Sequence, residues 1–258
     1  MAGKVGAMKK KTWLRAEVGA SRAIACLVLL ALWQAIALSG LFFQDVVPSI
    51  DRVLFAFWSV LADPLFYRNL GVTFGEMLVS LAVGCSTGLA AGLALGGSPF
   101  LSRAYEHFLH YLGSAPKIIF FPLMILWFGV GPGSKVGMGV ISCFFPVAIS
   151  VAAGMRAVNP VWIRVGRSFR ASPLQMVTKV YLPAMRTPIL NGFRLGVGVA
   201  IIGVLLAETK LSNQGLGFMV MQSYSRFDMP RMYALLIIVI AMAVAFNTLA
   251  MRLAGSKP

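Results

Sequence analysis

Long stretches without a single charged side chain are what most limits the folds open to this chain. Four of them, each of twenty residues or more, are residues 23–44, 77–102, 136–155 and 232–251. A helix of that length crosses the roughly 30 Å hydrocarbon core of a bilayer. With 59% hydrophobic and 12% charged side chains, a chain of 258 residues has too little polar surface for a water-soluble globule. The sequence therefore predicts an all-α, polytopic membrane protein.

Two less regular apolar stretches bring the predicted number of transmembrane helices to six. Residues 103–128 contain Pro116 and Lys117, and residues 187–208 contain Arg194 near their start. Proline removes a backbone donor, so we expect the third span to be broken or kinked at Pro116. The long side chain of Arg194 can reach the membrane interface from inside its helix.

The N-terminal region leaves one alternative open. A basic stretch precedes the first apolar run, and Ala35-Ile36-Ala37 is similar to the cleavage site of a secretory signal peptide. We expect an uncleaved anchor, with a basic cytoplasmic segment at residues 1–22 and a single transmembrane domain at 23–258. Within that domain, residues 45–68 have the apolar spacing of a short amphipathic helix, which we place at the outer interface.

Basic residues predict how the chain is oriented in the membrane. With the N-terminus inside, the inner segments carry fifteen Lys and Arg residues and the outer segments carry six. The positive-inside rule then places both termini, and the loop at residues 156–186, in the cytoplasm of a bacterial-type inner (plasma) membrane. Most of these basic residues lie in connecting segments, so topology explains the net charge of +15 and no nucleic acid partner is expected.

Glycines recur at every fourth position of the second span, and a shorter series lies in the fifth. One or two glycines are common in membrane helices, but four in register leave a smooth stripe where another helix can approach closely. We therefore expect tight helix packing along both stripes. The predicted packing residues are Gly84, Gly88, Gly92, Gly96, Gly192 and Gly196.

The loop at residues 156–186 has the most specific local chemistry. Asn159-Pro160 and Ser172-Pro173 each place a capping side chain directly before a proline, which is favoured at the first position of a helix. Two short helices should start there and form an elbow. The first should end near Arg170. The second should end before Leu182-Pro183, because a residue that precedes proline avoids helical geometry.

This elbow would offer both apolar and basic side chains to a partner. The apolar stripe consists of Leu174, Val177, Val180 and Tyr181. The positive charges come from Arg164, Arg167 and Arg170. Anionic lipid headgroups are the alternative partner of a basic loop. Two capped helices that keep an apolar face favour a protein partner instead.

Two motifs suggest chemistry that the chain is not expected to perform. Residues 129–135 resemble a phosphate-binding loop, but Ser134 separates the last glycine from Lys135, so we expect no ATP hydrolysis by this chain. Glu106, His107 and His110 could present metal ligands on one helical face, but the sequence offers no additional ligand nearby. We expect no metal site and no catalytic residue. A membrane-embedded metal-dependent enzyme is one alternative function, and an ATP-independent channel or scaffold is another.

Several motifs together resemble one family of membrane proteins. The spacing of residues in this loop is similar to that of the EAA loop of binding-protein-dependent ABC importer permeases. Arg170 follows Gly166 by four residues, and nine residues separate Arg170 from Val180-Tyr181-Leu182-Pro183. The family pattern reads Glu-Ala-Ala, three residues, Gly, nine residues, Ile-x-Leu-Pro. The chain also resembles the nitrate, sulfonate and taurine branch of this family. The positions that carry this resemblance are Pro116, residues 122–131, Ser134-Lys135, Phe144-Phe145-Pro146, Gly192-Phe193-Arg194, Ala207-Glu208 and Gly215-Leu216-Gly217.

The resemblance implies a type I ABC importer permease fold, with six transmembrane helices and a cytoplasmic coupling-helix loop. It implies a pair of permease subunits, expected here as a homodimer, with a substrate-binding protein outside. Two cytoplasmic ATPase subunits, and not this chain, would bind ATP and Mg. The implied substrate is a small anion such as a sulfonate, nitrate or an organic acid.

We expect residues for two tasks, and the resemblance implies the first of them. Those expected in the ATPase-coupling loop are Arg164, Gly166, Arg167, Arg170, Ala171, Ser172, Pro173, Leu174, Val177, Leu182 and Pro183. Residue type alone makes five residues candidates for the translocation pathway, since aromatic side chains can form a hydrophobic gate and a carboxylate at the end of a span can line a pathway: Trp127, Phe128, Phe144, Phe145 and Glu208. Core or lipid-facing positions are the alternative for the aromatic residues.

The chain departs from the family pattern at informative positions. The family's glutamate falls on Arg164 and its glycine on Arg170. Arginine adopts a left-handed turn less readily than glycine, so the elbow should be either less sharp or strained. The reversed charge at Arg164 suggests a partner groove with a compensating acid. Glu76 stands where relatives usually carry arginine.

Overall fold

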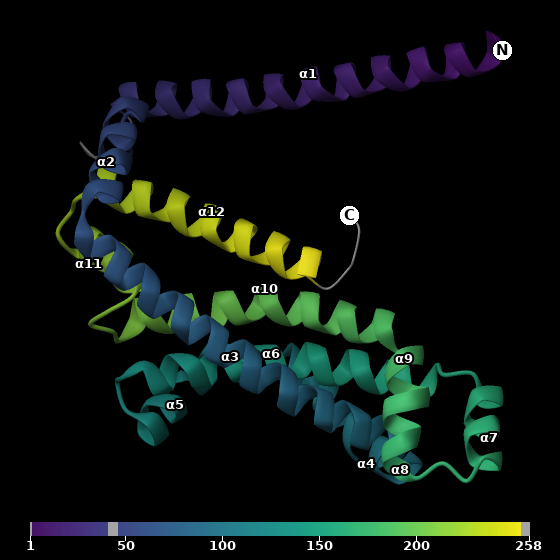
Figure 1. The fold of residues 1–258 in the computed structure, drawn as a ribbon. Coiled ribbons are helices and arrows are strands. Elements are labelled where there is room, and N and C mark those ends of the chain that lie inside the picture. Colours follow the sequence, from purple (N-terminus) through teal and green to yellow (C-terminus); the bar gives the residue numbers. More distant parts are fainter. Residues whose placement is uncertain (1, 41–45, 254–258) are drawn as a thin grey trace.

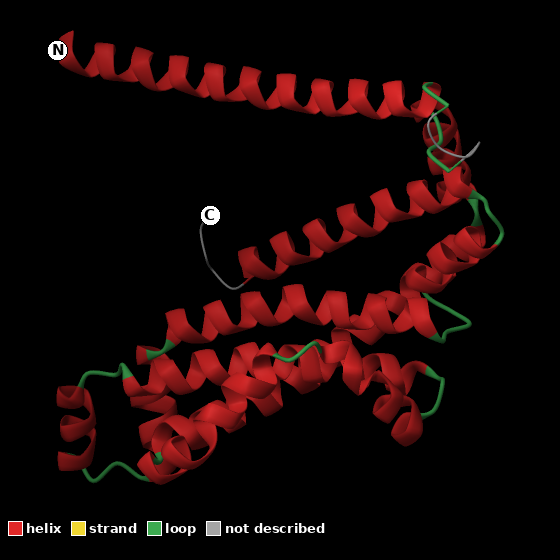
Figure 2. Cartoon of the chain, turned by 180° about the vertical axis from the view of Figure 1, so that it is seen from behind, coloured by secondary structure: helices red, strands yellow, loops and turns green. Residues whose placement is uncertain are grey.

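A computed structural model describes residues 2–40 and 46–253, and every regular element in these ranges is a helix (Figures 1 and 2). This confirms the predicted all-α class. The elements are α1 (Ala2–Leu38), α2 (Ile50–Ala62), α3 (Pro64–Gly97), α4 (Pro99–Ser114), η1 (Lys117–Phe120), α5 (Phe121–Phe128), α6 (Pro132–Arg156), α7 (Pro160–Ser168), α8 (Pro173–Gln175), η2 (Met176–Tyr181), α9 (Leu182–Ala184), α10 (Arg186–Lys210), α11 (Leu216–Ser225) and α12 (Met229–Leu253). The end of the first predicted span, at residues 41–44, and the basic Lys257 lie outside the described residues.

Five described helices are long and apolar enough to cross a membrane: Val18–Leu38 within α1, then α3, α6 and α10, and Met229–Leu249 within α12. The second of these extends beyond the charge-free run that predicted it. Asp63 starts α3, since its carboxylate accepts a hydrogen bond from Leu65 N at 2.9 Å with Pro64 at the first helical position. Ser98 then separates α3 from α4.

The third span in chain order is a broken one, and it brings the number of spans to six. The α4 helix and the segment Lys117–Phe128 are bent by 96° where Ala115 and Pro116 interrupt the helix, which confirms the predicted break. The α3 and α6 helices lie side by side and run in the same direction, as their contacts below show. The chain must therefore return between them, and α4, η1 and α5 make that crossing.

The α6 helix lies at the centre of the main body, and the glycines of α3 allow it to come close. A Cβ atom at Gly84, Gly88, Gly92 or Gly96 would lie 2.6 to 2.9 Å from the Cβ atoms of Cys143, Val147, Val151 and Met155, taken in that order. Real Cβ atoms do not approach so closely, so each position requires glycine. Because both series rise in steps of four, the two helices are parallel.

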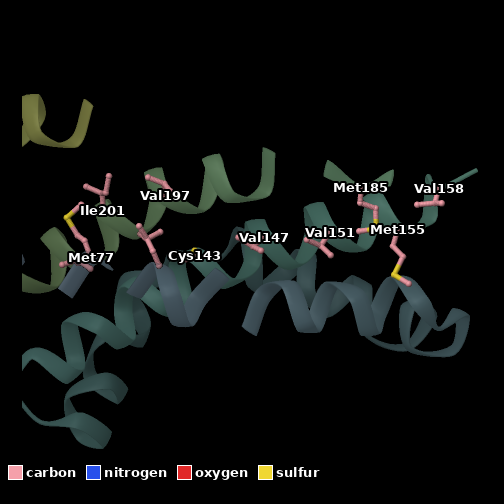
Figure 3. Close-up of a cluster of buried hydrophobic side chains, with 12 residues drawn as sticks. Met77, Cys143, Val147, Val151, Met155, Val158, Met185, Val197 and Ile201 are labelled. Carbon is pink, nitrogen blue, oxygen red and sulfur yellow. The ribbon is translucent and has the colours of Figure 1, made fainter. Parts of the chain in front are cut away.

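The α10 helix packs on α6 in the opposite direction. A Cβ atom at Gly192 would lie 2.8 Å from Ser150 Cβ, and one at Gly196 would lie 2.9 Å from Cys143 Sγ. The contacts descend along α6 as α10 ascends, so this pair is antiparallel. Figure 3 shows the resulting core along α6, from Met77 and Ile201 at one end to Met185 and Val158 at the other.

The α1 helix lies apart from this body and joins it only near its C-terminal end (Figure 1). There Trp33 Nε1 donates a hydrogen bond to Pro48 O at 3.0 Å, and its ring meets Tyr233 edge-on at 5.1 Å. Gln34 Oε1 accepts a hydrogen bond from Ile50 N at 3.1 Å. Among the described contacts, those that hold the first span come from its final turns.

The predicted amphipathic helix corresponds to α2, although residues 64–68 belong to α3 instead. Val53 and Val60 are buried as the spacing predicted, whereas Leu54 is exposed. Asp63 pairs with Arg231 Nη2 at 2.7 Å and so joins the end of α2 to α12. The Leu65 N–H and the Arg231 guanidinium hold the pKa of Asp63 below its usual value.

We expect a leucine at Gly92 to force α3 away from α6. Overpacking of this kind costs about 1 to 3 kcal/mol of unfolding free energy. The matched control is Gly75→Leu, since a Cβ atom at Gly75 would have no neighbour within 4 Å. Thermal or denaturant unfolding of the purified protein in detergent measures both variants, and equal losses of stability would contradict the packing.

Candidate functional site

The segment between α6 and α10 folds into the predicted elbow, defined here as residues 157–185. Asn159 Oδ1 accepts a hydrogen bond from Val161 N at 2.9 Å and starts α7. Ser172 and Gln175 cap each other, with Ser172 N donating to Gln175 Oε1 at 2.8 Å and Gln175 N donating to Ser172 Oγ at 3.3 Å. Both predicted helix starts are confirmed. The capping box was present in the sequence as Ser-x-x-Gln but was not recognised.

The turn between α7 and α8 places an arginine in a left-handed conformation. Arg170 N donates to Arg167 O at 2.9 Å, and Ala171 N donates to Gly166 O at 3.1 Å. These two bonds form a Schellman motif, which normally has glycine at the position held here by Arg170. Arg170 has a φ of 51°. The elbow is therefore sharp and strained, which is the second of the two alternatives drawn from the sequence.

The second helix of the elbow does not end before Leu182-Pro183, so that prediction was wrong. It continues from α8 through η2, a π-helix, into α9, and Pro183 lies in the first turn of α9. A π-helix accommodates a residue that lacks an N–H, because its hydrogen bonds skip one residue more than those of an α-helix. Only Met185, which is fully buried, separates this helical run from α10.

The first helix of the elbow packs closely on the second. A Cβ atom at Gly166 would lie 2.6 Å from Met176 Sδ and 3.3 Å from Val180 Cγ2. Ile163 of α7 and Tyr181 of η2 both pack on the main core. Much of the predicted apolar stripe is therefore half-buried inside the molecule, and Leu174 is its exposed member.

The apolar side chains that the elbow exposes come mainly from α7. We call them, with the exposed arginines, the elbow surface. Phe169 is 83% exposed, Leu174 is 73% exposed and Trp162 is 53% exposed. The surface consists of Trp162, Val165, Phe169 and Leu174 with Arg164, Arg167 and Arg170. Sequence reasoning missed Trp162, Val165 and Phe169, although their spacing of three and four residues is that of one helical face.

An ion pair fixes the start of the elbow to α4. Arg156, the last residue of α6, donates to both carboxylate oxygens of Glu106 at 2.5 and 2.7 Å. Ser102 Oγ also donates to this carboxylate, at 2.7 Å. Glu106 thus acts as the partner of an arginine. Within the described residues, no group of three or more His, Cys, Asp or Glu could hold a metal ion.

A buried polar cluster lies at the opposite end of α10 from the elbow. It consists of Asn69 and Thr73 of α3 with Glu208 of α10, and it binds three successive N–H groups where α11 begins. Gly215 N donates to Asn69 Oδ1 at 2.7 Å, Leu216 N to Thr73 Oγ1 at 2.8 Å and Gly217 N to Glu208 Oε2 at 2.7 Å. Thr73 Oγ1 in turn donates to Glu208 Oε1 at 2.6 Å.

The glycines around Leu216 make this cluster possible. Gly215 has a φ of 102°, and a Cβ atom there would lie 2.4 Å from Glu208 Cδ. A Cβ atom at Gly217 would lie 2.7 Å from Glu208 Cβ. The Gly-Leu-Gly motif therefore leaves room for the carboxylate that caps α11.

A small cavity of about 190 Å³ lies beside the cluster, between Glu76 and Lys135. Lys135 is buried, and its Nζ donates to the carbonyl oxygens of Val130 and Gly131. In the loop that resembles a phosphate-binding motif, Lys135 therefore binds backbone carbonyl groups of the same loop. Glu76 Oε2 has no hydrogen-bond partner among the described residues.

The residues predicted along the pathway do not lie together. Trp127 and Phe128 are exposed on α5, whereas Phe145 is buried and lines a cavity of about 420 Å³ between α4, α6 and α10. Phe144 meets the Phe145 ring edge-on at 5.2 Å. Glu208 is 1% exposed and holds α11 instead of lining this cavity.

We expect Thr73→Val to lower the stability of the folded protein. The change removes the acceptor of the buried Leu216 N–H and the donor to Glu208, and an unsatisfied buried group costs about 1 to 3 kcal/mol. Thr73→Ser keeps the hydroxyl and should lose less. Unfolding in detergent measures both, and a serine variant as unstable as the valine variant would argue against the hydrogen bonds.

We expect Arg170→Gly to stabilise the elbow relative to Arg170→Ala. Both variants lose the same charge, but only glycine relieves the left-handed conformation, which costs other residues about 1 kcal/mol. Cleavage between α7 and α8 by a protease of broad specificity should be about fivefold slower in the glycine variant. Equal cleavage rates would show that the turn is not strained.

Comparison with known proteins gives three findings. Residues 84–255 match the family described as binding-protein-dependent transport system inner membrane component. A probable ABC transporter permease protein of Haemophilus influenzae is 31% identical over 217 residues, covering 84% of this chain and 88% of that protein. The taurine transport system permease protein TauC of Escherichia coli is 31% identical over 205 residues, covering 78% and 74%.

Two weaker similarities extend the comparison. A nitrate import permease protein of Synechococcus elongatus is 26% identical, covering 78% of this chain and 76% of that protein. A chain of the MetNI methionine ABC transporter, crystallised in inward facing conformations, superposes with a TM-score of 0.65. It covers 74% of this chain and 95% of its own length at 20% identity, and this shows a shared fold.

Proposed function

The chain belongs to the family of binding-protein-dependent transport system inner membrane components, and from this premise we propose how it works with its partners. It is the transmembrane permease subunit of an ATP-driven ABC importer, not an enzyme. ATP and Mg belong to separate ATPase subunits in this proposal. A substrate-binding protein delivers the solute from outside.

The elbow surface is the proposed contact with the ATPase, and its exposed apolar side chains are the observation that carries the proposal. Phe169 and Leu174 are exposed apolar side chains at the centre of a basic elbow whose two helices are both capped. Exposed apolar side chains of this kind are typical of a surface that docks into a groove of another protein. No Asp or Glu lies between residues 107 and 207, so the elbow surface is uniformly basic. The complementary groove would carry acidic residues around an apolar centre.

The elbow is also placed to move the membrane helices. It begins directly after Arg156 at the end of α6 and leads through Met185 into α10. Both helices continue to the opposite end of the body, where Lys135 and Glu208 lie. Movement of the ATPases would shift these helices together and alternate access between the two sides of the membrane.

The proposed assembly is a homodimer with two ATPase subunits, because a pair of elbows provides one contact for each ATPase. The start of α1 and the end of α12 point toward the same side as the elbow (Figure 1). We propose that both termini lie in the cytoplasm and that the chain lies in a bacterial-type inner membrane, and the distribution of basic residues supports this orientation. The proposed substrate is a small anion such as a sulfonate, nitrate or an organic acid, as the names of the relatives suggest.

Reversal of the charge at Arg164 tests the ATPase contact. We expect Arg164→Glu to lower solute transport and the ATPase activity stimulated by the loaded binding protein by about tenfold, or about 1.4 kcal/mol. The assembled importer in proteoliposomes provides both measurements.

Arg226→Glu is the matched control for that experiment. Arg226 is exposed at the end of α11, on the opposite side of the body from the elbow. It should leave transport unchanged. Normal coupling in the Arg164 variant would sink the proposed charge complementarity.

A further inference from the structure

Lys117 places an ammonium group in the middle of the membrane-spanning body. It is the first residue of η1, where the third span is broken, and its Nζ lies 5.8 Å from the centroid of the Phe145 ring. Phe145 is near the midpoint of α6, a span of 25 residues. Both ends of α6 are therefore about equally far from this charge, too far for a lipid headgroup to reach it without leaving the interface.

The described residues give this ammonium no anionic partner. Its Nζ donates a hydrogen bond to Gly113 O and lies over the Phe145 ring. The ion pairs found among residues 2–40 and 46–253 use other side chains. A cation at this depth is costly and usually marks a pathway for an ion or a substrate. The charge of Lys117 is therefore available to a ligand.

The cavity beside Lys117 is large enough for a small organic molecule. Its volume is about 420 Å³, within the range of ligand pockets. The walls come from the end of α4, from η1, from the middle of α6 and from the outer half of α10. They include Lys117, Ser142, Phe145, Ile149, Ile202 and Leu206.

The chemistry of these walls selects for one kind of ligand. Lys117 is the one charged residue among those that line the cavity, and most of the others are apolar. Ser142 Oγ donates to Met138 O at 2.7 Å, so its oxygen lone pairs remain able to accept a hydrogen bond. A single ammonium beside apolar walls complements one negative charge attached to an apolar body.

We propose that this cavity binds the transported solute during its passage, with the Lys117 ammonium holding its anionic group and the apolar walls holding its carbon chain. The inference rests on the proposed function as an importer and names the solute class as organic monoanions, such as alkyl sulfonates or alkyl carboxylates. Arg194, a cation within α10, is exposed elsewhere on that helix and does not line the cavity.

The test uses the complete importer, with its ATPase subunits and binding protein, in vesicles of phosphatidylcholine alone. The probes are radiolabelled ethanesulfonate, butanesulfonate and butyrate. For whichever of these the wild-type importer takes up, we expect Lys117→Met to lower the maximal rate about tenfold or more, whereas Lys117→Arg keeps most of it. ATP hydrolysis stimulated by the loaded binding protein should change less than twofold in both variants.

The control variant is Lys210→Met, which removes the same charge at the exposed outer end of α10. It should transport at the wild-type rate. Wild-type transport by the Lys117→Met variant would overturn the proposal, and so would an equal loss in the methionine and arginine variants together with lost ATPase stimulation. The latter result would show that Lys117 supports the fold.

Three further outcomes separate the alternatives. If the defect of Lys117→Met appears only when an anionic phospholipid is added to the vesicles, the charge serves a lipid and the proposal fails. If the wild-type importer shows no ATP-dependent uptake of any anion but moves an uncharged solute, the proposed substrate class fails as well. If it moves no solute at all, the importer function itself fails, a result distinct from both.

Discussion

The close contact of α6 with α3 and α10 is the interaction on which the rest of the structure depends. Lipid is as apolar as the helix surfaces, so burial of apolar area does little to hold membrane helices together. Contact at short range must do so instead, and the four glycines of α3 bring its backbone against α6 from Cys143 to Met155. The α10 helix completes the unit from the other side through Gly192 and Gly196.

The two functional ends of the molecule are attached to this unit in different ways. At one end, Arg156 and Met185 connect α6 and α10 to the elbow, with the Glu106 carboxylate fixing the position of Arg156. At the other end, side chains of α3 and α10 cap α11. The α1 helix stands outside the unit, and its described contacts lie in its last turns.

Local signals in the sequence were sufficient for much of this. The caps at Asn159 and Ser172 act over three residues or fewer, so the starts of α7 and α8 could be predicted. The glycine period showed which face of α3 was smooth, but not that α6 would fill it. Sequence reasoning failed where the partner is distant in the sequence: Thr73 and Glu208 are 135 residues apart, and the π-helix before Pro183 packs against Gly166 of α7.

The glycine stripe has a consequence for how the chain can change in length. An α-helix turns by about 100° per residue, so one inserted or deleted residue between Gly84 and Gly96 would rotate the later glycines off α6. The same change in α6 would misplace its residues against both neighbours at once. These helices can therefore accept many substitutions on their outer faces, yet their lengths are fixed to the residue. Additions to the chain fit only beyond their ends.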